Sequence, residues 1–86
     1  MMDLDQFFNR LEDLVEWYIV TTNIYPKTLV ISSELMRQLT KSPGFYQRRE
    51  LGIGTTPYSP LVRTLKIKDA VLHVKEDENE KFLYLR

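Results

Sequence analysis

The last third of the chain carries the two-residue period of β-strands, and this pattern constrains the fold more than any other feature. Residues 61–67, 70–75 and 81–86 each predict a strand, separated by a turn at residues 68–69 and an acidic turn at residues 76–80. We therefore expect the last two strands to pair as a C-terminal β-hairpin. Both faces of the final strand are apolar, which predicts either a covered sheet or self-association through this strand.

The N-terminal residues 3–20 have the period of an α-helix instead. Asp3 suits the N-cap position, and turn-forming residues at 21–23 mark the helix end. Trp17 lies about 120° from the centre of the apolar stripe, at ~100° per residue. Either the long loop covers Trp17 or this side chain anchors a partner, and the sequence leaves both open. The stripe consists of Leu4, Phe7, Phe8, Leu11, Leu14, Val15, Tyr18 and Ile19.

A buried strand and a short second helix are expected in the middle of the chain. Residues 28–31 form a short apolar run, which is typical of a strand buried on both faces. Ser32 is a good N-cap for a helix over residues 33–40. The sequence therefore predicts one α+β domain over residues 1–86. Its amphipathic first helix and short second helix would pack on a small mixed or antiparallel sheet that ends in the hairpin.

Composition excludes several classes of protein. Hydrophobic residues make up 43% of the chain, which argues against intrinsic disorder. No apolar run approaches the ~20 residues that a membrane span needs, so we expect no membrane partner. The chain has no cysteine, which excludes disulfides and thiolate metal sites.

Residues 41–60 are predicted to be an irregular loop, because prolines and glycines interrupt every regular pattern there. A loop this long in a small domain is usually functional, mobile or covering a surface. Its interleaved rings and guanidinium groups suit a protein interface or a nucleic-acid-binding loop, or the rings fold back onto the sheet. With Trp17, these residues are the candidate partner-binding set: Phe45, Tyr46, Arg48, Arg49 and Tyr58.

No arrangement of residues points to catalysis or to a cofactor. His73 is the only histidine and has no second histidine or cysteine to complete a zinc site. Residues 52–56 are rich in glycine but lack the lysine of a phosphate-binding loop. The acidic residues 76–80 lack the glycine and distal glutamate of an EF-hand loop. We expect no enzyme activity, no metal and no cofactor.

Charge is segregated along the chain although the net charge is zero. Residues 1–20 hold five acidic residues and one basic residue, a net charge of −4. Residues 21–66 hold seven basic and two acidic residues, a net charge of +5, and residues 67–86 carry −1. This dipolar distribution suits acidic-to-basic association between chains.

Residues 25–39, with the sequence YPKTLVISSELMRQL, resemble a segment of tailed-phage major capsid proteins. In that family a proline leads an apolar strand, a small polar cap follows, and a helix with two leucine-like residues comes next. The resemblance implies a small phage or prophage product that acts in the virion or in the cytoplasm of the host cell.

The sequence favours a non-catalytic protein-binding module, either a minor assembly component of a phage particle or a modulator of a host protein. The alternative is a nucleic-acid-binding accessory protein that uses the basic aromatic loop 41–60. If that loop only recognises a partner, alanine at Arg48 and Arg49 should weaken binding and leave the melting temperature nearly unchanged.

Overall fold

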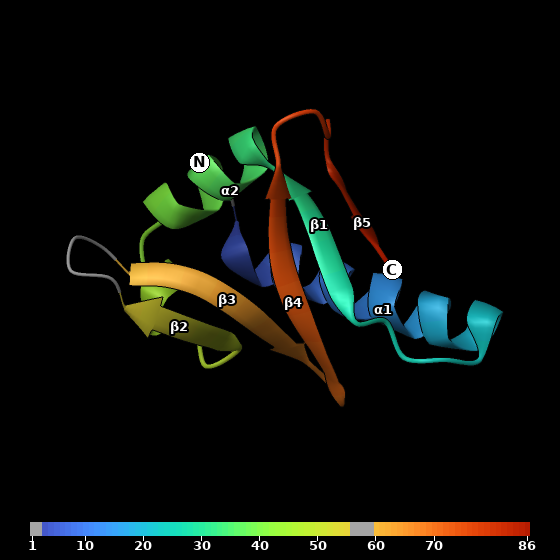
Figure 1. Ribbon diagram of the computed structural model, residues 1–86. Helices are drawn as coiled ribbons and strands as arrows, with labels where there is room; N and C mark the ends of the chain where they lie inside the picture. Colours follow the sequence, from blue (N-terminus) through green and yellow to red (C-terminus); the bar gives the residue numbers. More distant parts are fainter. Residues whose placement is uncertain (1–2, 56–59) are drawn as a thin grey trace.

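The computed structural model describes residues 3–55 and 60–86, and it has two helices packed on a mixed five-stranded sheet (Figure 1). The α+β class expected from the sequence is confirmed. In chain order the elements are α1 (Leu4–Thr22), β1 (Thr28–Ser32), α2 (Ser33–Lys41), a short 3₁₀ helix η1 (Phe45–Gln47), β2 (Leu51–Thr55), β3 (Pro60–Ile67), β4 (Ala70–Asp77) and β5 (Leu83–Leu85).

The helix ends lie where the sequence predicts them. Asp3 caps α1, because its carboxylate accepts a hydrogen bond from the backbone N–H of Gln6 at 3.2 Å. Asn23 ends α1 in the left-handed conformation, with φ 61°, and its N–H donates to the carbonyl of Ile19. The Ser32 hydroxyl accepts from the N–H of Leu35 at 3.0 Å, so β1 runs directly into α2.

The strand order is β2-β3-β4-β1-β5, and it corrects one prediction. β1 lies between β4 and β5, parallel to β4 and antiparallel to β5, so the expected hairpin of the last two strands is wrong (Figure 1). β3 and β4 instead form an antiparallel hairpin. Its turn lies at Lys68, where φ is 54°, and Asp69, as the sequence suggested.

The segment 41–60 is more regular than predicted. It contains η1 and the strand β2, which pairs antiparallel with β3 at the edge of the sheet. Glycine is unfavourable in strands, but here it permits close contact. A Cβ on Gly52 would lie 2.1 Å from the Thr64 hydroxyl oxygen on β3. The prediction of an irregular loop over this segment is therefore wrong for residues 45–47 and 51–55.

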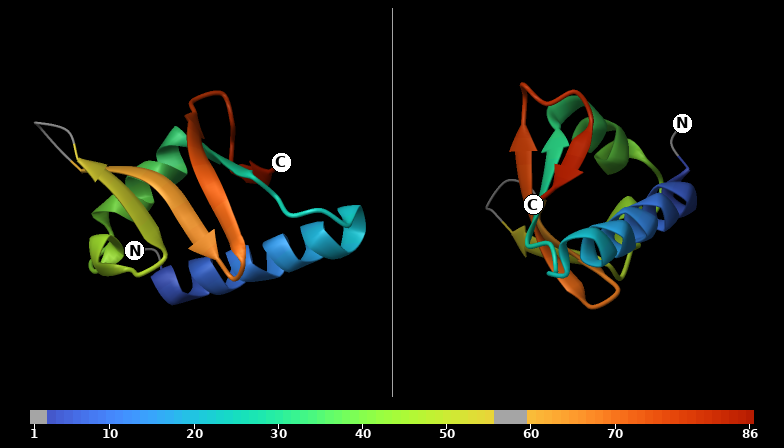
Figure 2. Two further views of the ribbon diagram at one scale, coloured as in Figure 1. Left: turned by 60° about the horizontal axis from the view of Figure 1, so that its bottom comes forward. Right: turned by 90° about the vertical axis from the view of Figure 1, so that its right-hand side faces the viewer.

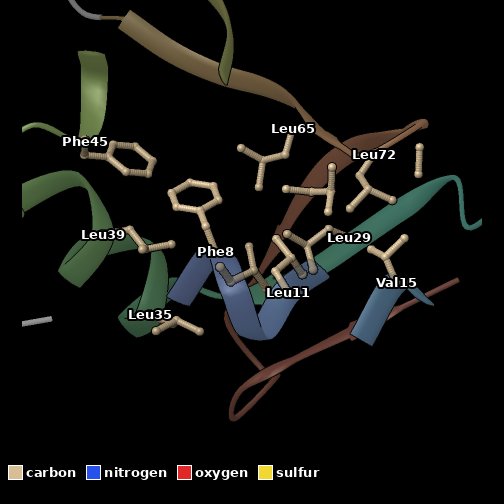
Figure 3. Close-up of a cluster of buried hydrophobic side chains, with 12 residues drawn as sticks. Phe8, Leu11, Val15, Leu29, Leu35, Leu39, Phe45, Leu65 and Leu72 are labelled. Atoms are coloured by element: carbon tan, nitrogen blue, oxygen red, sulfur yellow. The ribbon is translucent and has the colours of Figure 1, made fainter. Parts of the chain in front are cut away.

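The core lies between one face of the sheet and both helices (Figure 2). Phe8, Leu11 and Val15 of α1 meet the central strands, where Leu29 and Leu72 are fully buried (Figure 3). β1 is buried from Leu29 to Ser32, which confirms the strand expected there. The other buried members of this cluster are Ile31, Leu35, Leu39, Phe45, Leu65, Ile67 and Ala70.

The C-terminal part of α1 extends past the core. The three buried residues of the helix are Phe8, Leu11 and Val15, and residues 16–22 contain none. In Figure 2 this end of α1 projects beyond the strands before the chain turns back into β1. Here the helix continues past the sheet, which leaves apolar side chains at its C-terminal end exposed to solvent.

Candidate protein-binding surface

Four large apolar side chains are exposed at the projecting end of α1. Trp17 is 63% exposed, Val20 79%, Ile24 60% and Tyr25 54%. We call these four residues the α1 tip. Of the two possibilities that the sequence left open for Trp17, cover by the long loop is the one that the structure contradicts.

The spacing of the α1 tip follows from helix geometry. Trp17 and Val20 are three residues apart, so they lie on one side of α1, and Ile24 follows just beyond the left-handed cap at Asn23. For side chains of about 150–250 Å² each, the exposed fractions leave on the order of 500 Å² in this patch. That area is at the upper end of the apolar patches found on ordinary monomers, which marks the α1 tip as a candidate interface.

Charged residues border the α1 tip. Glu16 pairs with Lys68 at 3.2 Å, which ties the last turns of α1 to the β3–β4 turn. Both side chains are substantially exposed, so this ion pair contributes little stability and mainly orients the helix. Asp13 and Arg10 lie exposed farther along the same helix. The patch therefore has an apolar centre and a polar border, as protein interfaces do.

The structure places Phe45 in the core, which corrects its assignment to a partner-binding surface. Phe45 is 2% exposed and belongs to the same buried cluster as Phe8 and Leu39 (Figure 3). Its ring also packs edge-on against Tyr46, with 5.2 Å between ring centroids. Phe45 therefore holds the 45–50 segment against the body of the protein.

Arg48 is also occupied within the fold. Its guanidinium donates to Asp5 on α1 at 2.5 Å and to Glu50 at 3.0 Å, and it lies over the Phe8 ring at 4.5 Å. The hydrogen bond to Asp5, together with the one to Glu50, raises the pKa of Arg48 above its ordinary value although partial burial lowers it. Because Arg48 joins α1 to the segment before β2, we now expect its removal to lower the melting temperature, in place of the nearly unchanged value predicted from the sequence.

The remaining members of the predicted set have different environments. Tyr46 is 39% exposed and Arg49 is exposed, so both are accessible to a partner. Tyr58 lies outside the described residues. The structure thus separates Trp17 from the 45–49 segment. The five described members of the set do not form one surface, because Phe45 is in the core and Arg48 is bonded within the fold.

Sequence reasoning missed three residues of the α1 tip: Val20, Ile24 and Tyr25. Val20 lies outside the apolar stripe, on the same side of the helix as Trp17. The spacing of three residues between these two apolar side chains is a signal that could have found Val20. Ile24 and Tyr25 follow the helix end, where the sequence gives no measure of burial.

Two grooves also lie on the surface of the protein. One, of about 760 Å³, lies between α1 and α2, with Phe7, Leu35 and the exposed Phe82 among its lining residues. The other, of about 750 Å³, lies between α2, β3 and β4 and includes the exposed His73. Among the described residues no group of three or more histidines, cysteines or carboxylates could hold a metal ion.

Comparisons with known proteins return no relative. The chain matches no family model, no curated protein and no solved structure. Within the part of the chain that the structure describes, no helix has the length and apolar character to cross a membrane.

Proposed function

We propose that the protein is a non-catalytic protein-binding module that associates with a second copy of itself through the α1 tip. The exposure of Trp17, Val20, Ile24 and Tyr25 at the end of an overrunning helix carries this proposal. Tryptophan and tyrosine are the side chains most enriched at the energetic centres of interfaces. The folded monomer itself leaves these side chains exposed, so their burial is available to an association.

A symmetric pair suits this surface. In a twofold dimer each patch faces its own copy, so an apolar patch with a polar border is complementary to itself. A standard interface takes about 800 Å² from each partner. The roughly 500 Å² of the α1 tip would supply the centre of such an interface, with the polar border around it. We expect weak, concentration-dependent association.

The test is the solution mass of the chain as a function of concentration, measured by analytical ultracentrifugation. We expect mass above the 10.3 kDa of one chain as concentration rises. Val20→Lys should return the protein to one-chain mass because it places a charge at the centre of the patch. Asn9→Lys is the matched control: it adds the same charge to an exposed α1 position about 16 Å from Val20, at 1.5 Å per residue.

Two results would contradict the proposal. One is a wild-type mass of one chain at every accessible concentration. The other is equally strong self-association of the Val20→Lys and Asn9→Lys variants. Circular dichroism on each variant checks that the fold is intact, so that a change in mass reports the surface alone.

The biological setting of this proposal rests on the resemblance of residues 25–39 to the capsid segment. These residues include β1 and α2. On that resemblance we propose a small phage or prophage product, either an assembly component or a modulator of a host protein, in the virion or the host cytoplasm. The structure disfavours nucleic-acid binding through segment 41–60, because Arg48, one of its two arginines, already bonds to Asp5 and Glu50.

A further inference from the structure

The sheet divides between β3 and β4. These two strands pair from Ile67–Ala70 up to Thr64–His73, and no register pair follows among the described residues. Beyond that point β3 continues beside β2, whereas β4 continues beside β1 as far as Asp77. Figure 1 shows β3 and β4 diverging from their common turn. The C-terminal half of β4 therefore has a strand on one side only.

The free side of β4 carries backbone hydrogen-bonding groups. The N–H of His73 donates to the carbonyl of Lys27 beside β1, so His73, Lys75 and Asp77 direct their backbone groups toward β1. Backbone groups alternate sides along a strand. Glu76 therefore directs its N–H and C=O toward the gap between β4 and β3. The groups of Glu76 thus offer an added strand one N–H and one C=O at an otherwise unoccupied strand side, which is the starting point for pairing with another strand.

The gap is a groove with an apolar base. Its volume is about 750 Å³, and Met36 of α2, Val62 of β3 and Val74 of β4 line it. Side chains of an added strand that point inward would meet these three residues. Main-chain pairing supplies affinity in this mode of recognition, and pockets for alternate side chains supply specificity.

The charge of the groove selects among extended peptides. Arg37 and Arg63 line it against one carboxylate, Glu76. Arg37 also pairs with Glu34, but both side chains are 60% exposed, and such a pair is readily exchanged. The lining therefore favours a peptide with acidic side chains.

We propose that the groove between β3 and β4 binds an extended acidic segment of a partner protein, which adds to the sheet along the free side of β4. This site is distinct from the α1 tip, and it stands independently of the function proposed above. The partner is thus identified by its chemistry: an extended strand with apolar side chains alternating with aspartate or glutamate.

The experiment titrates the full chain with a fluorescent peptide of about eight residues, a typical strand length, that alternates valine and glutamate. Anisotropy should show saturable binding. A second peptide with lysine in place of glutamate should bind at least about tenfold more weakly because it meets Arg37 and Arg63. A third peptide carries N-methyl groups at alternate residues, on the N–H groups that would face β4. This peptide should not bind because it cannot donate hydrogen bonds to β4.

Variants of the protein locate the site. Glu76→Pro removes an N–H that faces the gap and pairs with no other strand, so the fold should survive while affinity falls by about tenfold, the equivalent of one backbone hydrogen bond. Trp17→Ala, at the α1 tip, is the control and should bind the peptide as the wild type does. If Glu76→Pro unfolds the protein, Arg37→Ala on the exposed face of α2 tests the charge.

Three outcomes overturn the proposal: no binding of the acidic peptide, equal binding of the lysine peptide, or undiminished binding of the N-methylated peptide. Backbone amide shifts provide an independent readout. We expect the largest changes at Val74 and Glu76, and changes confined to the α1 tip would refute the assigned location.

Discussion

Replacing Arg48 tests whether the 45–50 segment is held to the body of the protein as the structure indicates. Arg48→Ala removes the hydrogen bonds to Asp5 and Glu50 and the contact with the Phe8 ring. Asp5 is 81% exposed, so its bond is well screened and adds little. Glu50 is only 20% exposed, and a hydrogen bond between charged groups of this kind contributes about 1.5–3 kcal/mol.

Two further effects adjust the expected loss. The contact of the guanidinium with the Phe8 ring adds about 0.5–1 kcal/mol. Against this, the buried Nε of Arg48 has no acceptor among the described residues, which costs part of the gain. We therefore expect Arg48→Ala to lower the free energy of unfolding by about 2 kcal/mol. For a domain of this size that loss lowers the melting temperature by roughly 10 °C.

The matched control for this experiment is the neighbouring residue. Arg49→Ala removes the same charge from an exposed position and should stay within about 0.5 kcal/mol of the wild type. Arg48→Lys should fall between the two because an ammonium group cannot bond two carboxylates with the geometry of the planar guanidinium. Urea unfolding of all four proteins gives the comparison. Equal stability of Arg48→Ala and Arg49→Ala would refute the role assigned to Arg48.

The pH dependence of this contribution has a definite sign. The pKa of Arg48 is raised in the folded protein, so its contribution is complete below the ordinary arginine pKa and is lost only as pH rises through the raised value. Arg48 stays charged throughout the neutral range. Titration of this arginine should therefore cause no change with pH in the stability difference between Arg48→Ala and the wild type.

Three other predictions concern single contacts. Ser32→Ala should cost about 1–2 kcal/mol in urea unfolding because α2 loses its N-cap, and an unchanged midpoint would count against the cap. Gly52→Ala should destabilise the β2–β3 pair by about 1–3 kcal/mol, and Thr64→Ala in the same chain should relieve most of this loss if the clash is its cause. The hydrogen bond from Gln38, followed by the adjacent guanidinium, lowers the pKa of Glu34, so Gln38→Ala should raise that pKa in a nuclear magnetic resonance titration. Because the Glu34 pKa is depressed, its stabilising effect is present above the ordinary glutamate pKa and is lost as pH falls.

Local signals in the sequence predicted the local structure well. The periodicity of residues 3–20 and the cap residues Asp3 and Ser32 located both helices, because caps and amphipathic stripes depend on neighbours within a few positions. The apolar run at residues 28–31 correctly predicted a strand buried on both faces, and the strand is buried from Leu29 to Ser32. The same signals could not show which strands become neighbours.

The errors arise where distant parts of the chain meet. An acidic turn between β4 and β5 suggested a hairpin, but β1, from much earlier in the chain, occupies the place between them. β2 was missed because Gly52 and Gly54 have low strand propensity, and their value lies in close contact with β3. Arg48 was assigned to a binding surface because its partner Asp5 is 43 residues away.

The position of β1 also determines when this protein can fold. β1 is the most buried strand, yet both of its neighbours, β4 and β5, are made at least about forty residues after it. On the ribosome the nascent chain therefore carries a bare apolar segment until nearly all later residues have emerged. Pairing of distant segments is slow and leaves such segments prone to aggregation. Synthesis of this small domain should thus depend on chaperones more than its size suggests, and substitutions that weaken β5 should reduce soluble yield before they reduce measured stability.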